Sequence, residues 1–187
     1  MGSSTGASRT AAAKRSSQLR LPTASFAVQS ANREEWNRSR TMEDADFFTI
    51  GYSKRDSIEV IRLLRMAGVA TVVDIRHSAV SMFKPEFSKR NLSEWLNSFG
   101  IAYIHVPELG VPRDVRARSI HSIDRSELWI WYDEHVSTEF AGVNLHRFFN
   151  FADHPVAFMC LETDPCSCHR HRLQIALESH GLRGYDL

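Results

Sequence analysis

The sequence predicts a single α/β domain with an open, mostly parallel sheet of four or five strands and flanking helices. Short apolar runs rich in β-branched residues alternate with longer segments whose apolar residues recur at helical spacing. The strand–helix–strand units are short, which favours right-handed crossovers between parallel strands. At 187 residues and 43% hydrophobic content, the chain can form one ordinary core.

Residues 1–44 are predicted to be a disordered extension, and residues 45–187 the folded domain. Residues 1–41 hold seven basic residues against two acidic ones, and no acid precedes Glu34. This composition partly fits an organellar transit peptide. Met42, directly before the first predicted strand, is the preferred alternative as the natural start.

The first half of the domain reads as strand, helix and strand. Asp46–Tyr52 is the first strand. Asp56 lies three positions before Glu59, the spacing of a capping box, and begins a helix with a wide apolar face that Gly68 ends. Ala70–Ile75 is a second buried strand.

An irregular loop over residues 77–87 leads to a helix that Ser88 caps and Gly100 ends. Ile101–Val106 is the third strand. Residues 111–125 have many charges and few apolar anchors, which predicts a mobile loop or lid.

Two helices are predicted over residues 128–136 and 139–151, with their aromatic residues in the core. A fourth strand follows at residues 156–161, then a helix that runs to about Ser179. Residues 181–187 form a last short strand or a tail.

Polar side chains lie at or just beyond the carboxyl end of each of the first four predicted strands. In strand order they are Ser53; Asp74 and Arg76; Glu108; and Cys160, Glu162 and Asp164. Carboxyl ends of parallel strands share one edge of the sheet, where ligands bind in open α/β folds, so we expect these groups to converge.

Two arginines at this edge could hold a phosphate or carboxylate. Arg76 and Arg170 are the candidates, with Asp74 orienting Arg76 and with Ser53 and His169 as further anion-binding residues. The alternative is that each arginine pairs internally, with Asp74 or with Asp164.

Glu108, Glu162 and Cys168 are the candidate catalytic residues. Crowded carboxylates separate an acid from a base or nucleophile, and a thiol beside a helix start, a histidine and an arginine should have a lowered pKa. Four residues are assigned structural roles: Gly51 ends the first strand, Cys160 belongs to the core, Asp164 caps the last helix and Pro165 stops the fourth strand.

No metal or cofactor is predicted. Cys166 and Cys168 could share a zinc ion with His169 or His171, but a second ligand pair at a recognised spacing is missing, so zinc is kept only as an alternative. The absence of a Gly-x-Gly-x-x-Gly motif and of a Walker loop argues against a dinucleotide-dependent dehydrogenase and a P-loop ATPase.

Composition excludes several classes. No apolar run approaches membrane-spanning length. Residues 42–187 hold 16 basic and 20 acidic residues, so broad binding to duplex nucleic acid is not expected. Three cysteines do not make a secreted disulfide framework, which favours a reducing, cytoplasmic location.

Four motifs resemble the bacterial and archaeal family known as domain of unknown function 488. They are residues 49–53 (TIGYS), 73–76 (VDIR), 107–110 (PELG), and 159–165 (MCLETDP) with 168–170 (CHR). The resemblance covers about residues 47–187 and implies a Rossmann-like fold with a shared polar pocket. The family usually has His where this chain has Tyr52, and a second Gly where it has Val111.

The functional expectation is an enzyme, a hydrolase or transferase, that binds a phosphorylated nucleotide or nucleic-acid-derived anion at the strand carboxyl edge. Carboxylates would supply acid–base or nucleophilic chemistry. The alternatives are a non-catalytic module that senses a nucleotide or anion, consistent with Tyr52 in place of His, and a thiol or metal site at Cys166 and Cys168.

Overall fold

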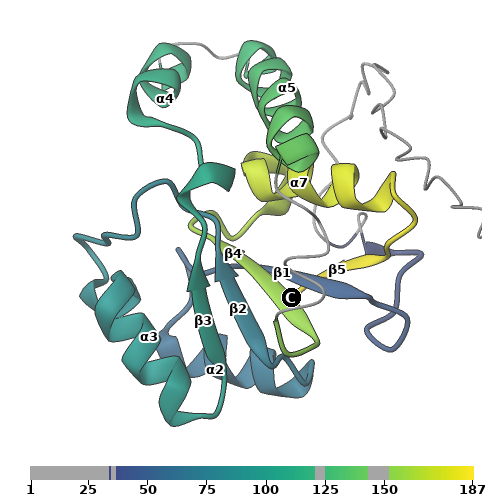
Figure 1. The fold of residues 1–187 in the computed structure, drawn as a ribbon. Coiled ribbons are helices and arrows are strands. Elements are labelled where there is room, and N and C mark those ends of the chain that lie inside the picture. Colours follow the sequence, from purple (N-terminus) through teal and green to yellow (C-terminus); the bar gives the residue numbers. More distant parts are fainter. Residues whose placement is uncertain (1–33, 35–36, 121–124, 143–151) are drawn as a thin grey trace, which may run out of the picture.

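The fold is an open parallel sheet, seen in a computed structural model that describes residues 34, 37–120, 125–142 and 152–187 (Figure 1). Within these residues the sheet has five strands in the order β3-β2-β4-β1-β5, and every neighbouring pair is parallel. The strands are β1 (Phe47–Gly51), β2 (Thr71–Asp74), β3 (Ala102–His105), β4 (Val156–Cys160) and β5 (Gly184–Asp186). This confirms the predicted Rossmann-like α/β class, and residues 184–186 are a strand.

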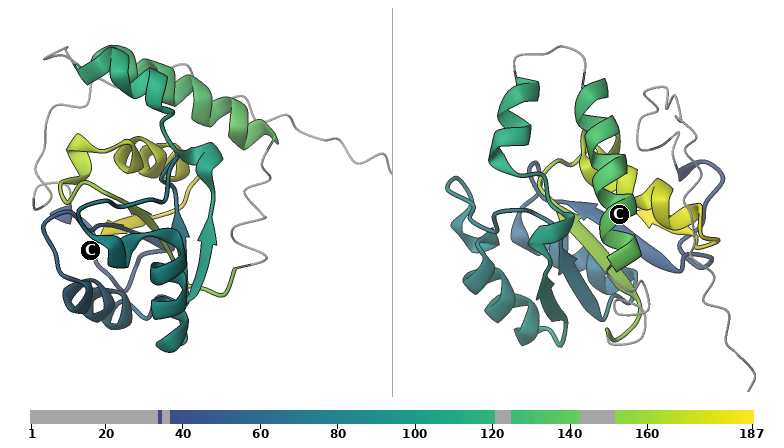
Figure 2. Two further views of the ribbon diagram at one scale, coloured as in Figure 1. Left: turned by 90° about the vertical axis from the view of Figure 1, so that its left-hand side faces the viewer. Right: turned by 45° about the horizontal axis from the view of Figure 1, so that its top comes forward.

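Helices cover both faces of the sheet (Figures 1 and 2). One face packs against α2 (Ser57–Met66) and α3 (Lys89–Ser98), and the other against α5 (Ser126–Gly142) and α7 (His169–Glu178). The apolar residues form two cores, one on each face, because successive side chains of a buried strand point to opposite sides. The two layers are called here the α2–α3 face and the α5–α7 face.

The central strand β4 lies at a change of chain direction. The chain leaves β1 and β2 toward helices on the α2–α3 face, whereas it leaves β4 toward α7 on the opposite face. Because β4 lies between β1 and β2, the loops on either side of its carboxyl end lead to the α2–α3 face. The loop that follows β4 itself leads to the α5–α7 face. Open α/β sheets bind ligands at such topological switch points.

The prediction of a loop over residues 111–125 is wrong for part of this stretch. Residues Arg113–Ile120 form helix α4, beside α5 in Figure 1. The helix was missed because five of its eight residues are polar or charged, with Val115 as a buried apolar anchor. An i,i+4 ion pair between Asp114 and Arg118 supports its exposed side.

One helix replaces the two that were predicted after residue 128. Helix α5 continues through Ser137 and Thr138, whose hydroxyls both donate to the carbonyl of Glu134. Hydroxyl groups that bond back to the preceding turn need not break a helix. The predicted continuation over residues 143–151 lies outside the described residues.

Helix starts agree with the sequence in one case and differ in two. The Asp56 side chain accepts a hydrogen bond from the backbone N–H of Glu59, at 2.7 Å, as predicted. Ser88 stands at the start of α3, but its hydroxyl bonds the backbone of Ser81 instead of capping the helix. Cys168, and not Asp164, is the residue that caps α7.

Part of the predicted extension lies against the sheet. The Asn37 side chain exchanges two hydrogen bonds with the backbone of Asp186 in the edge strand β5, and Arg40 pairs with Glu178 of α7. These contacts come before residue 45, where the sequence placed the domain boundary. Residues 1–33 of the extension lie outside the described residues. In the described parts of the chain, no helix is both long and apolar enough to cross a membrane.

Candidate functional site

Strand alternation separates the predicted site residues into two groups. On β2, Asp74 shares the α2–α3 face with Val72, and the partners of Arg76 belong to that core. On β4, Cys160 belongs to the α5–α7 core. All these residues reach the carboxyl edge, but from opposite sides of the sheet.

Arg76 is built into the α2–α3 face. Its Nε and one amino group donate to the two carboxylate oxygens of Asp74, and the other amino group donates to the Tyr52 hydroxyl at 2.7 Å. A further bond goes to the carbonyl of Phe87, and the Asp74 carboxylate also accepts from Tyr103. Burial alone would lower the pKa of Arg76, but Asp74 raises it above its usual value, so the guanidinium keeps its charge.

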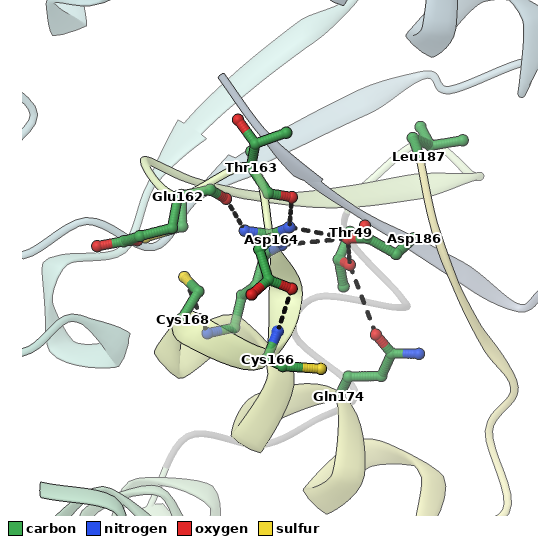
Figure 3. Close-up of polar contacts among 12 residues, drawn as sticks. Thr49, Glu162, Thr163, Asp164, Cys166, Cys168, Gln174, Asp186 and Leu187 are labelled. Atoms are coloured by element: carbon green, nitrogen blue, oxygen red, sulfur yellow. Dashed lines mark hydrogen bonds and ion pairs between the residues drawn. The ribbon is translucent and has the colours of Figure 1, made fainter. Parts of the chain in front are cut away.

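Arg170 is built into the opposite face. Its guanidinium, which is fully buried, pairs with Asp186 of β5 and donates to the carbonyls of Glu162 and Thr163 in the loop that leaves β4. The Thr49 hydroxyl of β1 also donates to Asp186 (Figure 3). Arg170 therefore ties the β4–α7 loop to strands β1 and β5.

The arginines are thus held by the internal pairing that was the alternative to a substrate clamp. Arg76 pairs with Asp74, as that alternative expected. Arg170 pairs with Asp186 and not with Asp164. Both side chains are at least 94% buried and donate their hydrogen bonds to other groups of the protein. Each arginine therefore links neighbouring segments at the edge of the sheet, a structural role that we call a brace.

A second set of polar groups does come together at the end of β4. Cys160, Cys168 and His169, which we call the thiol cluster, have ligand-type atoms within 4.8 Å of one another. The Cys160 sulfur lies 3.7 Å from His169 Nδ1, and the Cys168 sulfur 4.0 Å from the same nitrogen. The half-buried Glu162 carboxylate borders the cluster, 3.4 Å from the Cys160 sulfur. Chemically, the group offers two sulfur ligands, one imidazole and an adjacent carboxylate.

The prediction of a lowered pKa at Cys168 is wrong. Burial raises the pKa of this thiol, and the neighbouring Cys160 and Glu162 raise it further. At Glu162, burial acts to raise the pKa, but hydrogen bonds from the thiols bring the net shift below the usual value. In this arrangement the carboxylate is the acceptor and the thiols are donors.

Cys166 does not belong to the thiol cluster. In Figure 3 the sulfur atoms of Cys166 and Cys168 point to opposite sides of the β4–α7 loop. The pair expected to share an ion is therefore replaced by Cys160 and Cys168, with His169 as the third member. Cys160, assigned to the core by its place in an apolar strand, is both 99% buried and a member of the cluster.

The other predicted site residues lie around this centre. The Ser53 hydroxyl bonds that of Thr163 at 2.9 Å and so connects β1 to the loop after β4. Asp164 caps the short 3-10 helix Pro165–Ser167, in which Pro165 is buried. Glu108 lies in the 3-10 helix Pro107–Leu109 with an exposed side chain, and its backbone carbonyl bonds His135.

Gly51 allows the close approach of β1 to this loop. A Cβ atom at Gly51 would lie 1.8 Å from the Glu162 carbonyl oxygen and 2.8 Å from an amino group of Arg170. A side chain there would collide with backbone, so glycine is required for packing rather than for an unusual torsion.

The family model for "Domain of unknown function DUF488" matches residues 56–177 of this chain. The chain belongs to this family. The matched segment contains the whole thiol cluster, Glu162 and both braced arginines, whereas Gly51, Tyr52 and Asp186 lie outside it. No curated protein and no solved structure matches the chain.

Sequence reasoning missed four residues that complete the site of this DUF488 domain. Asp186 holds Arg170, Thr49 bonds Asp186, Tyr103 bonds Asp74, and the ring of Tyr132 lies 5.1 Å from that of His169. Tyr132 could have been recognised from the sequence, because a tyrosine expected in the core needs a hydrogen-bond partner for its hydroxyl. In the structure this hydroxyl donates to the carbonyl of Leu109. Asp186 and Thr49 carried none, because their pairing depends on the register of β1 with β5.

A cavity of about 360 Å³ lies away from this centre. It is formed where residues 39–45 meet residues 178–184, before the start of β1 and of β5. It therefore faces the amino edge of the sheet. The thiol cluster and Glu162, at the carboxyl end of β4, do not line this cavity.

Proposed function

We propose that the protein is an enzyme, a hydrolase or transferase, whose reactive group is Glu162 at the carboxyl end of β4. The observation that carries the proposal is the contact between this half-buried carboxylate and the thiol cluster at the switch point of the sheet. Three cysteines in the thiol form support a reducing location, for which we propose the cytoplasm.

In a hydrolytic reaction, Glu162 would act as the general base. A water oxygen forms a bond to the electrophilic carbon or phosphorus of the substrate, while the Glu162 carboxylate takes the proton from that water. The bond to the leaving group breaks, and the leaving group keeps the electron pair. It then receives the proton from Glu162, which restores the carboxylate.

The proposed substrate is a small anionic compound of the nucleotide type. Two exposed cations flank the loop that carries Glu162: the backbone N–H of Lys54 bonds Thr163, and the Arg125 guanidinium donates to the carbonyl of Ser167 at 2.8 Å. Exposed cations are available to a ligand in a way that the braced Arg76 and Arg170 are not.

Replacing Glu162 by glutamine should lower turnover about a hundredfold or more while the fold is kept, because the amide cannot accept the proton. The measurement is single-turnover product analysis by mass spectrometry over a panel of phosphorylated nucleosides, nucleotide sugars and dinucleotides. The matched control is Glu94→Gln, the same substitution at an exposed site on α3.

Two outcomes would contradict the catalytic proposal. Full activity in Glu162→Gln removes this residue from the mechanism. Calorimetric binding of a nucleotide with no product in wild-type protein favours the sensing module instead.

Replacing Lys54 and Arg125 together by alanine should raise KM roughly three- to tenfold and leave kcat nearly unchanged, because the two cations attract the substrate without taking part in the reaction. The effect should shrink at high salt. Arg65→Ala, an exposed cation in the last turn of α2, is the control. An unchanged KM would place the anion elsewhere.

A further inference from the structure

We propose that the thiol cluster binds one divalent ion of the zinc type, with Cys160, Cys168 and His169 as its protein ligands. Cys160 is the last residue of β4, and the other two begin α7, so the loop between them closes back on the strand. All three are at least 96% buried. The proposal concerns binding alone, and it does not rest on the proposed reaction.

The distances between donor atoms fit a tetrahedral ion. With zinc–sulfur bonds of about 2.3 Å and zinc–nitrogen bonds of about 2.0 to 2.1 Å, a tetrahedron places sulfur about 3.6 Å from nitrogen. The sulfur-to-Nδ1 distances of His169 are 3.7 Å for Cys160 and 4.0 Å for Cys168. Each sulfur therefore needs to move by only a few tenths of an ångström relative to Nδ1. The His169 ring must also turn, because an ion on Nδ1 would place the Cys160 sulfur about 5 Å from Nε2, whereas that sulfur lies 3.8 Å from it.

The orientation of His169 is a second, independent observation. Its Nε2 lies 3.3 Å from the carbonyl oxygen of Ile75, an atom that can only accept a hydrogen bond. Nε2 therefore carries the proton, although the Cys160 sulfur is also near it, at 3.8 Å. In the neutral ring, Nδ1 is then the nitrogen whose lone pair is available to an ion. Metal-binding histidines are held by this kind of outer bond to a carbonyl.

The donor set selects the ion. Two sulfurs and an imidazole suit zinc and disfavour calcium and magnesium, which bind oxygen. When zinc binds, two sulfur–hydrogen bonds break, two zinc–sulfur bonds form, and two protons leave to solvent with no change in oxidation state. Three protein ligands leave one tetrahedral position, and the neighbouring Glu162 carboxylate lies outside the group of three.

The test uses the full chain, purified without chelator and supplied with zinc. Elemental analysis should find about one ion per chain. Cobalt added to stripped protein should give the near-ultraviolet charge-transfer bands of sulfur-to-cobalt bonds, which report thiol ligation in the wild type without any variant. Cys160→Ser and Cys168→Ser should each weaken binding about a hundredfold or more. Cys166→Ser, two positions from a ligand but outside the cluster, should keep the ion.

Two results would overturn the assignment: less than half an ion per chain after supply of zinc to the reduced protein, or an equal loss in Cys166→Ser. Glu162→Gln should retain the ion, and loss of the ion from this variant would contradict the three-ligand assignment. Since binding is measured without substrate, its failure leaves the proposed reaction untouched. Conversely, a metal-loaded protein with an active Glu162→Gln variant would refute only the reaction.

Discussion

Arg170→Ala is expected to lower the free energy of unfolding by about 3 to 5 kcal/mol. The guanidinium and its partner Asp186 are both fully buried, so the substitution leaves a carboxylate without its counter-ion in the α5–α7 core. It also removes the donors that hold the carbonyls of Glu162 and Thr163. With typical domain stabilities of about 5 to 15 kcal/mol, the variant should be close to unfolding. Urea denaturation followed by circular dichroism measures the change.

Arg90→Ala is the control that distinguishes the loss of a buried ion pair from the loss of an arginine charge at the surface. Arg90 forms an exposed i,i+4 ion pair with Glu94, so its loss should cost about 1 kcal/mol at most. In Arg170→Met with Asp186→Leu, both charges are removed together and much of the stability should return. If Arg170→Ala is as stable as wild type, the guanidinium is not a brace and is available to a ligand.

Gly51→Ala is expected to destabilise the domain by about 3 kcal/mol or more, at the upper end of the effects of overpacking. The added methyl group would lie 1.8 Å from the carbonyl oxygen of Glu162 and 2.5 Å from its carbonyl carbon, and neither backbone atom can turn aside. The carboxyl ends of β1 and β4 would have to separate, which would also displace Glu162. Thermal unfolding and turnover should therefore fall together.

Gly68→Ala distinguishes this collision from the general cost of replacing a glycine. Gly68 has a φ of +64°, and a methyl group added there would meet no atom within 4 Å, so only the strain of a left-handed alanine applies, about 1 to 2 kcal/mol. Equal losses in the two variants would show that β1 and the β4–α7 loop are not in close contact.

The fold was predictable because its signals are local. Buried strands and amphipathic helices such as α2 leave clear periodic patterns, and Asp56 marks a helix start by itself. Helix α4 left no such pattern, because its charged residues face solvent and, among residues 113–118, whose burial is described, Val115 is the buried one.

The site was predictable in location and less so in its internal contacts. Counting residues past each strand end grouped Cys160, Glu162 and Asp164, and the Cys160 and Glu162 side chains are in contact. Cys168 and His169, which the sequence placed near the start of the next helix, lie beside Cys160. The same reasoning grouped Arg76 with them, although Asp74 and Arg76 turn to the α2–α3 face. Which face a side chain takes, and whether Asp186 or Asp164 meets Arg170, depends on register and strand order, which no local pattern records.

The position of β4 has a consequence for synthesis on the ribosome. Strands β1 and β2 touch each other only through β4, which follows them in the chain by about a hundred and by about eighty residues. At typical elongation rates, roughly 5 to 20 s pass between the synthesis of β1 and that of β4, its partner strand. During this time the edge of β1 can pair with other nascent chains. The two halves of the sheet are joined only when residues 156–160 insert between them. We therefore expect the thiol cluster to assemble late, in the same step that closes the sheet.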